Sequence, residues 1–486
     1  MGNVLKNREQ SSLNIGIFRE YDIRGIVGED FDSSLAYDLG LAYASMVLSA
    51  QVRRDNRNPS CSELGPLRVG VGYDCRLSTE PMKQELIRGL LDGGVDVLDC
   101  GMGPTPQLYF SVYNQKLDAG IQITASHNPG EYNGFKMMIG AKTLSGPDIS
   151  RLRDAVLAGG LIQVSPEARG QEEFFNARQS YIEDLVERSK DFVSHERKLK
   201  IVVDAGNGVG GLVGPELLRR LGCEVIELFT EPDGRFPNHH PDPTVIENLK
   251  DLSLTVIKEG ADAGIAWDGD ADRIGVVDEH GNPIFGDMLL ILFGRQLLCE
   301  VENPIIIGDV KCSDLLFDDL SSKGAQTVMA KTGHSLIKAR LRELSAHLAG
   351  EMSGHMFFVH RYYGFDDALH ASARLVEILS KAKQPLSELL SDLPIRVSTP
   401  ELRVDCPESI KFEVAKKITQ AFPEYEVGLI DGVRVRFAKG WGLVRASNTQ
   451  PALVLRFEAE DALLLDEYRS LVEGRLREVI AEVSSS

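Results

Sequence analysis

A strand–helix–strand pattern recurs three times along the chain and constrains its fold more than any other feature. The three copies begin at LRVGVGYD (67–74), LKIVVD (199–204) and PIIIGD (304–309), and each continues with a helical pattern and a second apolar strand. Alternation of apolar strands with helical stretches is typical of βαβ units and largely parallel sheets. The pattern therefore predicts an α/β fold.

Each copy then reaches a related phrase, in which Ala-Gly precedes a polar loop that contains glycine. The phrases are AGIQITASHNP from 119, AGIAWDGDADR from 263 and AGEMSGH from 349. A shared dipeptide can be a coincidence, but the strand–helix–strand order around it also repeats. We interpret the three segments as diverged copies of one domain. Such copies would place the three loops at equivalent strand ends, where open α/β sheets bind ligands.

The last ninety or so residues follow a different pattern. VGLIDGVRVRF (427–437) carries an Asp-Gly hairpin signal, and WGLVRASNTQPALVLRFEA (441–459) alternates like two paired strands around a loop, with helical stretches on either side. We therefore expect three similar α/β domains with mixed, largely parallel sheets, followed by a C-terminal α+β domain. The expected boundaries are 1–172, 173–282, 283–393 and 394–486. Residues 52–66, polar and without periodicity, predict a surface insertion or a disordered segment.

The charge of the chain excludes some classes of partner. A net charge of −19 argues against a surface for nucleic acid or for an anionic membrane. No apolar run approaches the ~20 residues that span a bilayer, and the N-terminal stretch has no apolar core typical of a signal peptide. The 7 cysteines form no Cys-x-x-Cys pair. We expect a cytoplasmic protein, in which any phosphate ligand needs cations gathered locally.

The loop DGDADR supplies three carboxylates at alternate positions, Asp268, Asp270 and Asp272. Carboxylates this close repel one another unless a hard cation neutralises them, and Mg²⁺ is the usual choice in phosphate chemistry. A calcium loop of the EF-hand type would also fit the spacing, since Glu279 stands at its twelfth position. However, Arg273 occupies the sixth position, where glycine is needed, and the flanks look like strands. The loop could also belong to a dehalogenase-type phosphatase or be a plain solvated turn.

Ser126 lies in ITASHNPGEYNGFK (123–136), without the Gly-x-Ser-x-Gly elbow of many hydrolases. By itself it could be a nucleophile, a helix cap or a turn residue. The local sequence leaves these three roles open.

Four motifs occur along the chain in this order: TASHNP, DGDADR, GEMSGH and RASNTQP. They resemble the α-D-phosphohexomutase superfamily, most closely its bacterial phosphomannomutase/phosphoglucomutase branch, and the match runs from YDIRG at 21 to RASNT at 445. The resemblance implies three α/β domains and a fourth domain around a central cleft. It also implies interconversion of hexose 1-phosphate and hexose 6-phosphate (mannose, glucose or both) through a phosphoserine and a hexose 1,6-bisphosphate intermediate.

The resemblance also assigns roles to individual residues. The catalytic residues would be Ser126 as phosphate carrier, Lys136 for proton exchange with a lowered pKa, Arg24 and Arg273. The ligands of Mg²⁺ would be Ser126, Asp268, Asp270 and Asp272. The substrate-binding residues would be Tyr21, Arg24, Lys311, His334, Glu351, Met352, Ser353, Gly354, His355, Arg445, Ala446, Ser447, Asn448 and Thr449.

Simpler roles compete at three of these positions. Lys136 could be a solvated lysine, His334 a capping or packing residue, and Arg445 a surface arginine. Within the superfamily, the nearest rival activity is that of a phosphoglucosamine mutase. That branch generally carries Gln where Met352 stands and Gly-Thr-Glu-Pro where this chain has 448–451. A Mg²⁺-dependent phosphatase and a non-catalytic sugar-phosphate binder come from other classes. We expect small phosphosugars as partners, a hexose 1,6-bisphosphate as activator, no nucleic acid, no membrane, and a monomer or weak homo-oligomer.

Overall fold

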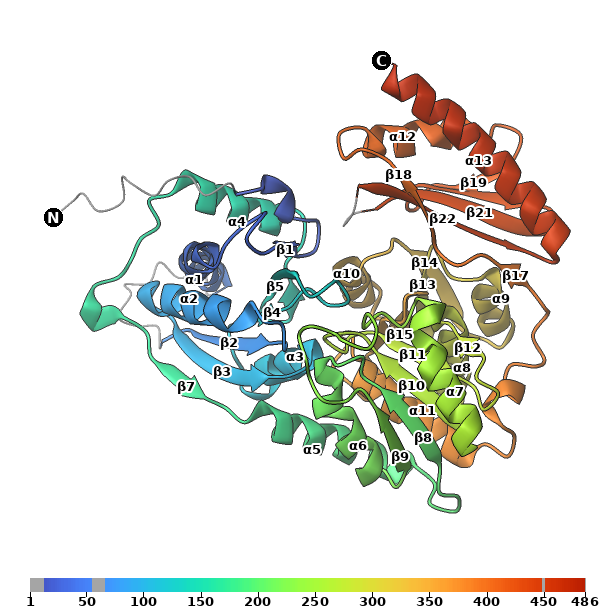
Figure 1. Ribbon diagram of the computed structural model, residues 1–486, viewed down its shortest axis with the longest axis horizontal. Helices are drawn as coiled ribbons and strands as arrows, with labels where there is room; N and C mark the ends of the chain where they lie inside the picture. The colour runs from blue at the N-terminus through green and yellow to red at the C-terminus, as the bar shows by residue number, and fades with distance from the viewer. Residues whose placement is uncertain (1–12, 55–65, 448–450, 486) are drawn as a thin grey trace. The chain divides into compact units, whose positions relative to one another are not determined.

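The computed structural model describes residues 13–54, 66–447 and 451–485 (Figure 1). The chain divides into two compact units. The first comprises Met1–Phe285 with Ser353–Ser387, and the second comprises Gly286–Met352 with Glu388–Ser486. The division falls within GEMSGH, between Met352 and Ser353.

The first unit opens with a mixed sheet of order β1-β5-β4-β2-β3-β7, with β6 paired to β5. Its strands are β1 (Ile23–Ile26), β2 (Arg68–Tyr73), β3 (Asp96–Met102), β4 (Ala119–Ile123), β5 (Tyr132–Ile139), β6 (Lys142–Thr143) and β7 (Glu172–Phe174). Strands β2, β3, β4 and β7 run parallel, while β5 is antiparallel to both β4 and β1. The helices around this sheet are α1 (Ser34–Arg54), α2 (Thr79–Asp92), α3 (Thr105–Asn114) and α4 (Pro147–Ala158).

Helices cover both faces of this sheet, and strand β2 shows why they can. Its residues Val69 and Val71 join the apolar core that includes α1 and α2, which lie side by side in Figure 1. Gly70 and Gly72 point to the other face, where Leu108 of α3 packs against them. Because glycine has no side chain, α3 can approach the sheet closely.

The second sheet of the first unit repeats this plan, with the order β12-β11-β10-β8-β9. Its elements are β8 (Lys200–Asp204), α6 (Gly214–Arg220), β9 (Glu224–Leu228), α7 (Lys250–Glu259), β10 (Ala263–Trp267), β11 (Ile274–Val277) and β12 (Pro283–Ile284). Strands β8, β9 and β10 run parallel, and β11 returns antiparallel to β10. Helix α5 (Ala177–Ser189) precedes this sheet. The later segment β16 (Met356–Phe358) and α11 (Ala368–Lys381) also belongs to this unit.

The second unit carries the third copy of the parallel core, in which β13 lies between β14 and β15. Its elements are α8 (Gly286–Leu298), β13 (Ile305–Asp309), α9 (Asp314–Ser322), β14 (Gln326–Ala330), α10 (His334–Leu344) and β15 (Leu348–Gly350). In each of the three copies, the first strand pairs in parallel with the second and the third. The loops of Ser126, Asp268 and Glu351 directly follow the third strand of their copies, which are β4, β10 and β15. The prediction of one repeated domain, with its polar loops at equivalent strand ends, is confirmed.

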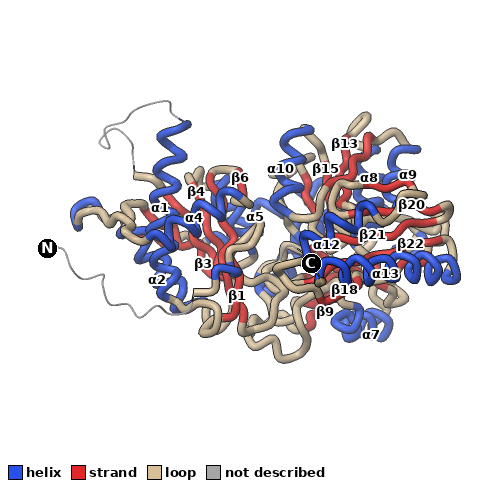
Figure 2. Tube along the Cα trace, turned by 90° about the horizontal axis from the view of Figure 1, so that it is seen from above, coloured by secondary structure: helices blue, strands red, loops and turns tan. Residues whose placement is uncertain are grey.

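The remainder of the second unit is an antiparallel α+β module, as predicted. Its elements are β17 (Val397–Ser398), β18 (Leu402–Asp405), α12 (Lys411–Lys417), β19 (Glu426–Gly428), β20 (Val433–Phe437), β21 (Gly440–Ala446), β22 (Ala452–Ala459) and α13 (Ala462–Ser484). The expected hairpin forms between β19 and β20, and RASNTQP joins β21 to β22. Helices α12 and α13 share one apolar core with the sheet, and Figure 2 shows α13 running along it.

One local prediction is partly wrong. Residues 52–54, expected in an insertion, continue helix α1, because the helical backbone extends to Arg54. Residues 55–65 of that predicted insertion lie outside the described residues.

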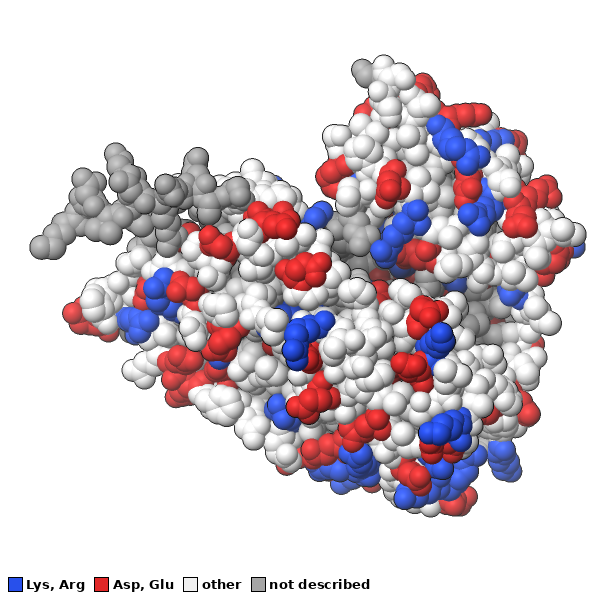
Figure 3. Space-filling model, viewed as in Figure 1, with Lys and Arg blue, Asp and Glu red and all other residues white. Residues whose placement is uncertain are grey.

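Among the described helices, none combines the length and the apolar character that crossing a membrane requires. On the face shown in Figure 3, acidic and basic side chains of the described residues are interspersed.

Candidate active site

Ser126 lies in a tight buried loop directly after β4. Its φ of 54° places it in the left-handed region, which costs a residue other than glycine about 1–3 kcal/mol. The hydroxyl donates a hydrogen bond of 2.7 Å to Oδ2 of Asp268, and His127 Nδ1 lies 3.2 Å from the same Oγ. No helix begins between β4 and β5, so the helix-cap interpretation of Ser126 is wrong. The fold holds Ser126 in a strained backbone conformation, in which its hydroxyl points at the acidic loop.

The acidic loop DGDADR forms the tight connection between β10 and β11, two antiparallel strands, so the EF-hand interpretation is wrong. Asp268, Asp270 and Asp272 are each 0% exposed, and one carboxylate oxygen from each lies within 4.8 Å of the other two. Asp268 Oδ1 accepts from the backbone N–H groups of Asp272 and Arg273, both at 3.1 Å, which closes the loop.

These three carboxylates fit a hard divalent cation. Within the described part of the chain, nothing donates a hydrogen bond to the buried Oδ1 of Asp270. A buried carboxylate oxygen without a partner is costly, and a cation would satisfy it. The oxygen of Ser126, beside Asp268, would be a fourth hard ligand of the kind that Mg²⁺ prefers.

The surroundings shift the pKa values of Asp268 and Asp272 in opposite directions. Burial, together with the charges of Asp272 and Asp270, raises the pKa of Asp268 well above its usual range. Burial acts in the same direction on Asp272, but Lys136 and His355 beside it outweigh burial and hold the pKa of Asp272 well below its usual range. The loop therefore combines a carboxyl that resists ionisation with one that stays ionised.

Lys136, on β5, reaches this loop and is only 3% exposed, so the solvated-surface interpretation is wrong. Its ammonium donates to Asp270 Oδ2 at 2.6 Å and also to Oδ2 of Asp272. Burial alone would lower the pKa of Lys136, but attraction to the three aspartates outweighs burial and raises it. These carboxylates hold the proton on the amine. The lowered pKa, expected for a lysine next to bound Mg²⁺ and an arginine, stays a prediction.

Arg24 and Tyr21 come from the N-terminal edge of the same sheet, where β1 pairs with β5. Arg24 donates to Asn128 Oδ1 at 2.7 Å, in the serine loop, and to Asp22 Oδ2 at 2.5 Å. Tyr21, next to Asp22, is buried. Arg24 is thus anchored within hydrogen-bonding distance of the loop that carries the serine.

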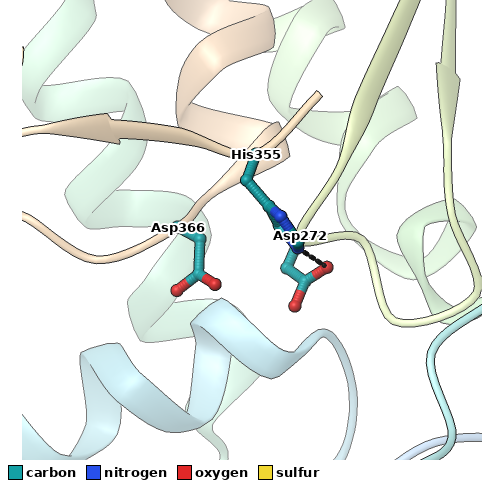
Figure 4. Close-up of side chains that lie close together, drawn as sticks. All are labelled: Asp272, His355 and Asp366. Carbon is teal, nitrogen blue, oxygen red and sulfur yellow. Dashed lines mark hydrogen bonds and ion pairs between the residues drawn. The ribbon is translucent and has the colours of Figure 1, made fainter. Parts of the chain in front are cut away.

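His355 lies beside the acidic loop in the first unit. Its Nε2 is 3.2 Å from Asp272 Oδ1, and the Nε of Arg273 is 3.3 Å from the same nitrogen. Figure 4 shows His355 and Asp272 in contact, with Asp366 beside them, and one ligand atom from each of the three lies within 4.8 Å of the other two. Gly354 has a φ of 95°, and a Cβ there would overlap the carbonyl of Ile274, so glycine is required at this position.

Two residues in contact with the acidic loop were missed by sequence reasoning. Asp366, 0% exposed, stands in GFDD, which matches none of the four motifs. Thr105, at the first position of α3, donates through its hydroxyl to Asp270 Oδ2 and through its N–H to the Asp270 carbonyl at 2.9 Å. Only the fold brings these residues to the loop, since each lies far from it in sequence.

The second unit holds a second group of predicted residues. Glu351, 1% exposed, accepts a hydrogen bond of 2.6 Å from the N–H of Gly333, and the N–H of Met352 donates to Asp309 Oδ1 at 3.1 Å. His334 is buried as the first residue of α10, directly after Gly333. The three-strand core thus places the GEMSGH loop and the start of α10 together.

Two basic side chains of this unit that were predicted to bind substrate are paired with carboxylates. Lys311 Nζ lies 3.1 Å from Glu401 Oε2, and Arg445 Nε donates to Asp431 Oδ2 at 2.8 Å. Burial lowers the pKa of Lys311, but the neighbouring carboxylates, Glu401 first, raise it further than burial lowers it. With a side chain only 6% exposed, Arg445 is not a surface arginine.

The structure therefore gathers the predicted residues into two groups, one in each unit. The group in the first unit is Tyr21, Arg24, Ser126, Lys136, Asp268, Asp270, Asp272, Arg273, Ser353, Gly354 and His355. The group in the second unit is Lys311, His334, Glu351, Met352, Arg445, Ala446 and Ser447, of which Ala446 and Ser447 are buried at the end of β21. Asn448 and Thr449, also predicted, lie outside the described residues.

Four domain models of one protein family match consecutive parts of the chain. The three alpha/beta/alpha domains of phosphoglucomutase/phosphomannomutase match residues 16–159, 179–281 and 285–397, and the C-terminal domain matches 401–474. Together they cover most of the chain in the order that the repeat pattern predicts.

Relatives match over almost the full length. A phosphomannomutase/phosphoglucomutase of Pseudomonas aeruginosa is 42% identical over 474 residues, 96% of this chain and 97% of its own. A phosphoglucomutase of Neisseria gonorrhoeae is also 42% identical, over 97% of this chain and 98% of its own. A crystal structure of a phosphoglucomutase/phosphomannomutase family protein from Burkholderia thailandensis aligns with a TM-score of 0.85 at 40% identity, covering 96% of this chain and 98% of that one. The chain therefore belongs to the phosphoglucomutase/phosphomannomutase family, within the α-D-phosphohexomutase superfamily, and it is a phosphohexomutase, as its four motifs predict.

Proposed function

We propose that this phosphohexomutase uses Ser126 as its phosphate carrier and acts on mannose and glucose phosphates through a 1,6-bisphosphate. The observation that supports this most directly is the hydrogen bond from Ser126 Oγ to Asp268 in a buried loop. A serine hydroxyl in this place needs no catalytic triad, since a serine phosphate ester can be activated by a cation and neighbouring positive side chains.

Asp268, Asp270, Asp272 and the Ser126 oxygen would hold Mg²⁺. When bound, the ion would neutralise charge on the transferring phosphoryl group. Arg273, next to the acidic residues, would bind the oxygens of that group, and Arg24 would polarise the sugar hydroxyl. These residues supply the cations that a protein with a net charge of −19 must gather locally for an anionic substrate.

Proton transfer would pass through Lys136. In the forward step the bond between Ser126 Oγ and phosphorus breaks, and phosphorus bonds to the sugar hydroxyl oxygen. The ammonium gives its proton to the departing Oγ, and the resulting amine takes the proton of the sugar hydroxyl. The raised pKa of Lys136 suits this order, because the residue begins as the acid.

The residues of the second unit would bind the rest of the substrate. Glu351 can accept hydrogen bonds from two neighbouring sugar hydroxyls, and Ser353, two residues later in the sequence, is expected to bind the sugar as well. Lys311 and His334 would contact the same ligand. Arg445, with Ala446, Ser447, Asn448 and Thr449, would bind the phosphate that is not reacting, which supplies binding energy for positioning the reacting end.

The residues at two places in the sequence favour mannose and glucose phosphates over glucosamine phosphate as substrates. Met352 and the sequence Asn448-Thr449-Gln450-Pro451 differ from the Gln and the Gly-Thr-Glu-Pro that phosphoglucosamine mutases generally carry. We further propose that the protein acts in the cytoplasm as a monomer or weak homo-oligomer.

Intact-mass analysis of the purified protein, combined with rates on mannose 1-phosphate and glucose 1-phosphate, tests this function. We expect about one phosphate per chain, lost in Ser126→Ala, and turnover stimulated by glucose 1,6-bisphosphate. A phosphatase would instead release inorganic phosphate in proportion to substrate consumed. Stoichiometric release, or activity only on glucosamine 1-phosphate, would overturn the proposal.

A further inference from the structure

Arg76, just after β2, makes an unusual set of contacts with the serine loop. Its side chain is 0% exposed, and its two terminal nitrogens donate to four backbone carbonyls of that loop. The acceptors are the carbonyls of Ser126 at 2.8 Å, Asn128 at 2.6 Å, Pro129 at 2.5 Å and Tyr132 at 2.9 Å. One guanidinium thus holds the loop from its serine to the first residue of β5.

The remaining N–H of the guanidinium is also used. Arg76 Nε donates to Asp74 Oδ2 at 3.0 Å, so all five N–H donors of the arginine have partners. Thr124 Oγ1 donates to the same Asp74 oxygen at 2.7 Å and accepts from the N–H of Ser126 at 2.9 Å. Both backbone polar groups of Ser126 are therefore held by the Asp74–Arg76 pair, its carbonyl directly and its N–H through Thr124.

A loop that follows β9 covers the guanidinium from outside. The ring of Phe236 lies 5.1 Å from the guanidinium carbon. A Cβ on Gly234 would overlap the carbonyl of Cys75, so the loop packs tightly on the backbone beside Arg76. This packing leaves the guanidinium plane little freedom to turn.

Such a contact set suits a role in positioning the serine. Ser126 has the left-handed φ described above, which persists only where the surroundings impose it. A lysine can supply at most three donors from one nitrogen and could not reproduce the planar, divergent set. The acidic loop is fixed separately by its own hydrogen bonds, so the relation of Oγ to Asp268 depends on where the serine loop is held.

We propose that Arg76, oriented by Asp74, is the positioning residue that presents the Ser126 oxygen for phosphoryl transfer. The guanidinium hydrogen bonds to Asp74 and to backbone carbonyls of the loop, so it acts through the backbone of the loop. The inference rests on the proposed role of Ser126 as phosphate carrier.

The test compares Arg76→Lys with a matched control, Arg374→Lys, since Arg374 is equally buried but belongs to α11. For each variant we would measure thermal stability, kcat and KM for mannose 1-phosphate, and the rate at which dephosphorylated enzyme takes phosphate from glucose 1,6-bisphosphate. A misplacement of about 1 Å can cost ~100-fold in rate, so we expect Arg76→Lys to slow serine phosphorylation and kcat by ~10–100-fold with KM within about twofold. Arg374→Lys should lose stability without that selective loss.

A second pair of variants covers the case in which Arg76→Lys does not fold. Asp74→Asn keeps nearly the same shape. Its amide N–H groups, however, would face the N–H and O–H groups that donate hydrogen bonds to Asp74. Its control is Asp204→Asn, at the equivalent strand end of the second copy, where the carboxylate accepts from Gly206 N–H and lies 3.0 Å from His239. Slow serine phosphorylation in Asp74→Asn, with a normal rate in Asp204→Asn, supports the inference.

Two outcomes overturn it. One is serine phosphorylation at the wild-type rate in folded Arg76→Lys and Asp74→Asn. The other is an equal slowing in the matched controls at equal loss of stability. If Ser126→Ala still takes up phosphate, the proposed phosphate carrier is wrong instead, and this arm separates the two failures.

Discussion

The ammonium of Lys311 and the carboxylate of Glu401 lie 3.1 Å apart in the second unit, with Arg445 close enough to lower the pKa of both. Burial raises the pKa of Glu401, but Lys311, Arg403 and Arg445 outweigh it and lower that pKa to about 2. Glu401 is therefore ionised throughout the working pH range. A phosphosugar that binds Lys311 must compete with this carboxylate for it.

Replacement of Glu401 by Gln tests that competition. We expect the KM for mannose 1-phosphate to fall about threefold or more at low salt, since removing one unit charge near an anion site is worth ~1 kcal/mol. kcat should change less than KM. A KM that rises would show that Glu401 orients Lys311 rather than competing with substrate. Glu426→Gln, an exposed glutamate on β19, is the control.

Ser126→Ala should abolish turnover while substrate binding stays measurable by calorimetry, because only the phosphate carrier is removed. Asn128→Ala, in the same loop, should retain part of the activity. Near-normal turnover in Ser126→Ala would refute the mechanism.

Arg445→Ala should raise KM strongly and also lower kcat, because the non-reacting phosphate positions the sugar. Arg436→Ala, with a side chain 61% exposed on the neighbouring strand, is the matched control and should leave both constants unchanged. Identical kinetics for the two variants would remove Arg445 from substrate binding.

Magnesium should stabilise the first unit, since it would bind three buried carboxylates only in the folded chain. We expect EDTA to abolish activity and to lower the Tm, and added Mg²⁺ to restore both. In Asp270→Asn the Mg²⁺-dependent part of the Tm should disappear. A Tm that does not respond to Mg²⁺ in the wild type would contradict the assignment of the metal site.

Asp367 gives a pH-dependent prediction for stability. Burial raises its pKa to about 6, although Tyr181 and Tyr362 donate hydrogen bonds to it. The folded chain therefore favours the neutral acid, so this contribution to stability is complete below pH ~4 and is lost as pH rises through 6, by about 3 kcal/mol.

Asp367→Asn removes this titration while keeping a side chain that can cap α11. The unfolding free energy of wild type minus variant should fall by about 2 kcal/mol between pH 4 and pH 7. Urea unfolding followed by Trp267 fluorescence, in a Trp441→Phe background, reports on the first unit alone. Asp405→Asn, exposed on β18, is the control, and a pH-independent difference would contradict the raised pKa.

The sequence predicted the fold, the serine loop and the acidic loop, because all three depend on local patterns. Strand β2 and helix α2 follow from their own apolar periodicity, and the three polar loops follow from the repeat. Ser126 and Asp268 were predictable from motifs, yet their hydrogen bond depends on two sheets packing together.

The missed features have a common physical reason. Thr105 and Asp366 reach the acidic loop from distant segments, and no local pattern marks them. Nor does the sequence show that two carboxylates lie within hydrogen-bonding distance of the Lys136 amine, where they raise its pKa. Arg76 likewise looks like an ordinary arginine after a strand until its four carbonyl partners are seen.

Ser353–Ser387 belongs to the first unit, although it follows Gly286–Met352 of the second unit in the sequence. This order affects how the protein is made. Trp267 of β10 donates a hydrogen bond of 3.0 Å to Ser372 of α11, and His355 contacts Asp272. A ribosome must therefore synthesise all of Gly286–Met352 before the first unit can be completed. A fragment that ends at Phe285 would lack both contacts, so the first unit is not separable as a contiguous N-terminal piece.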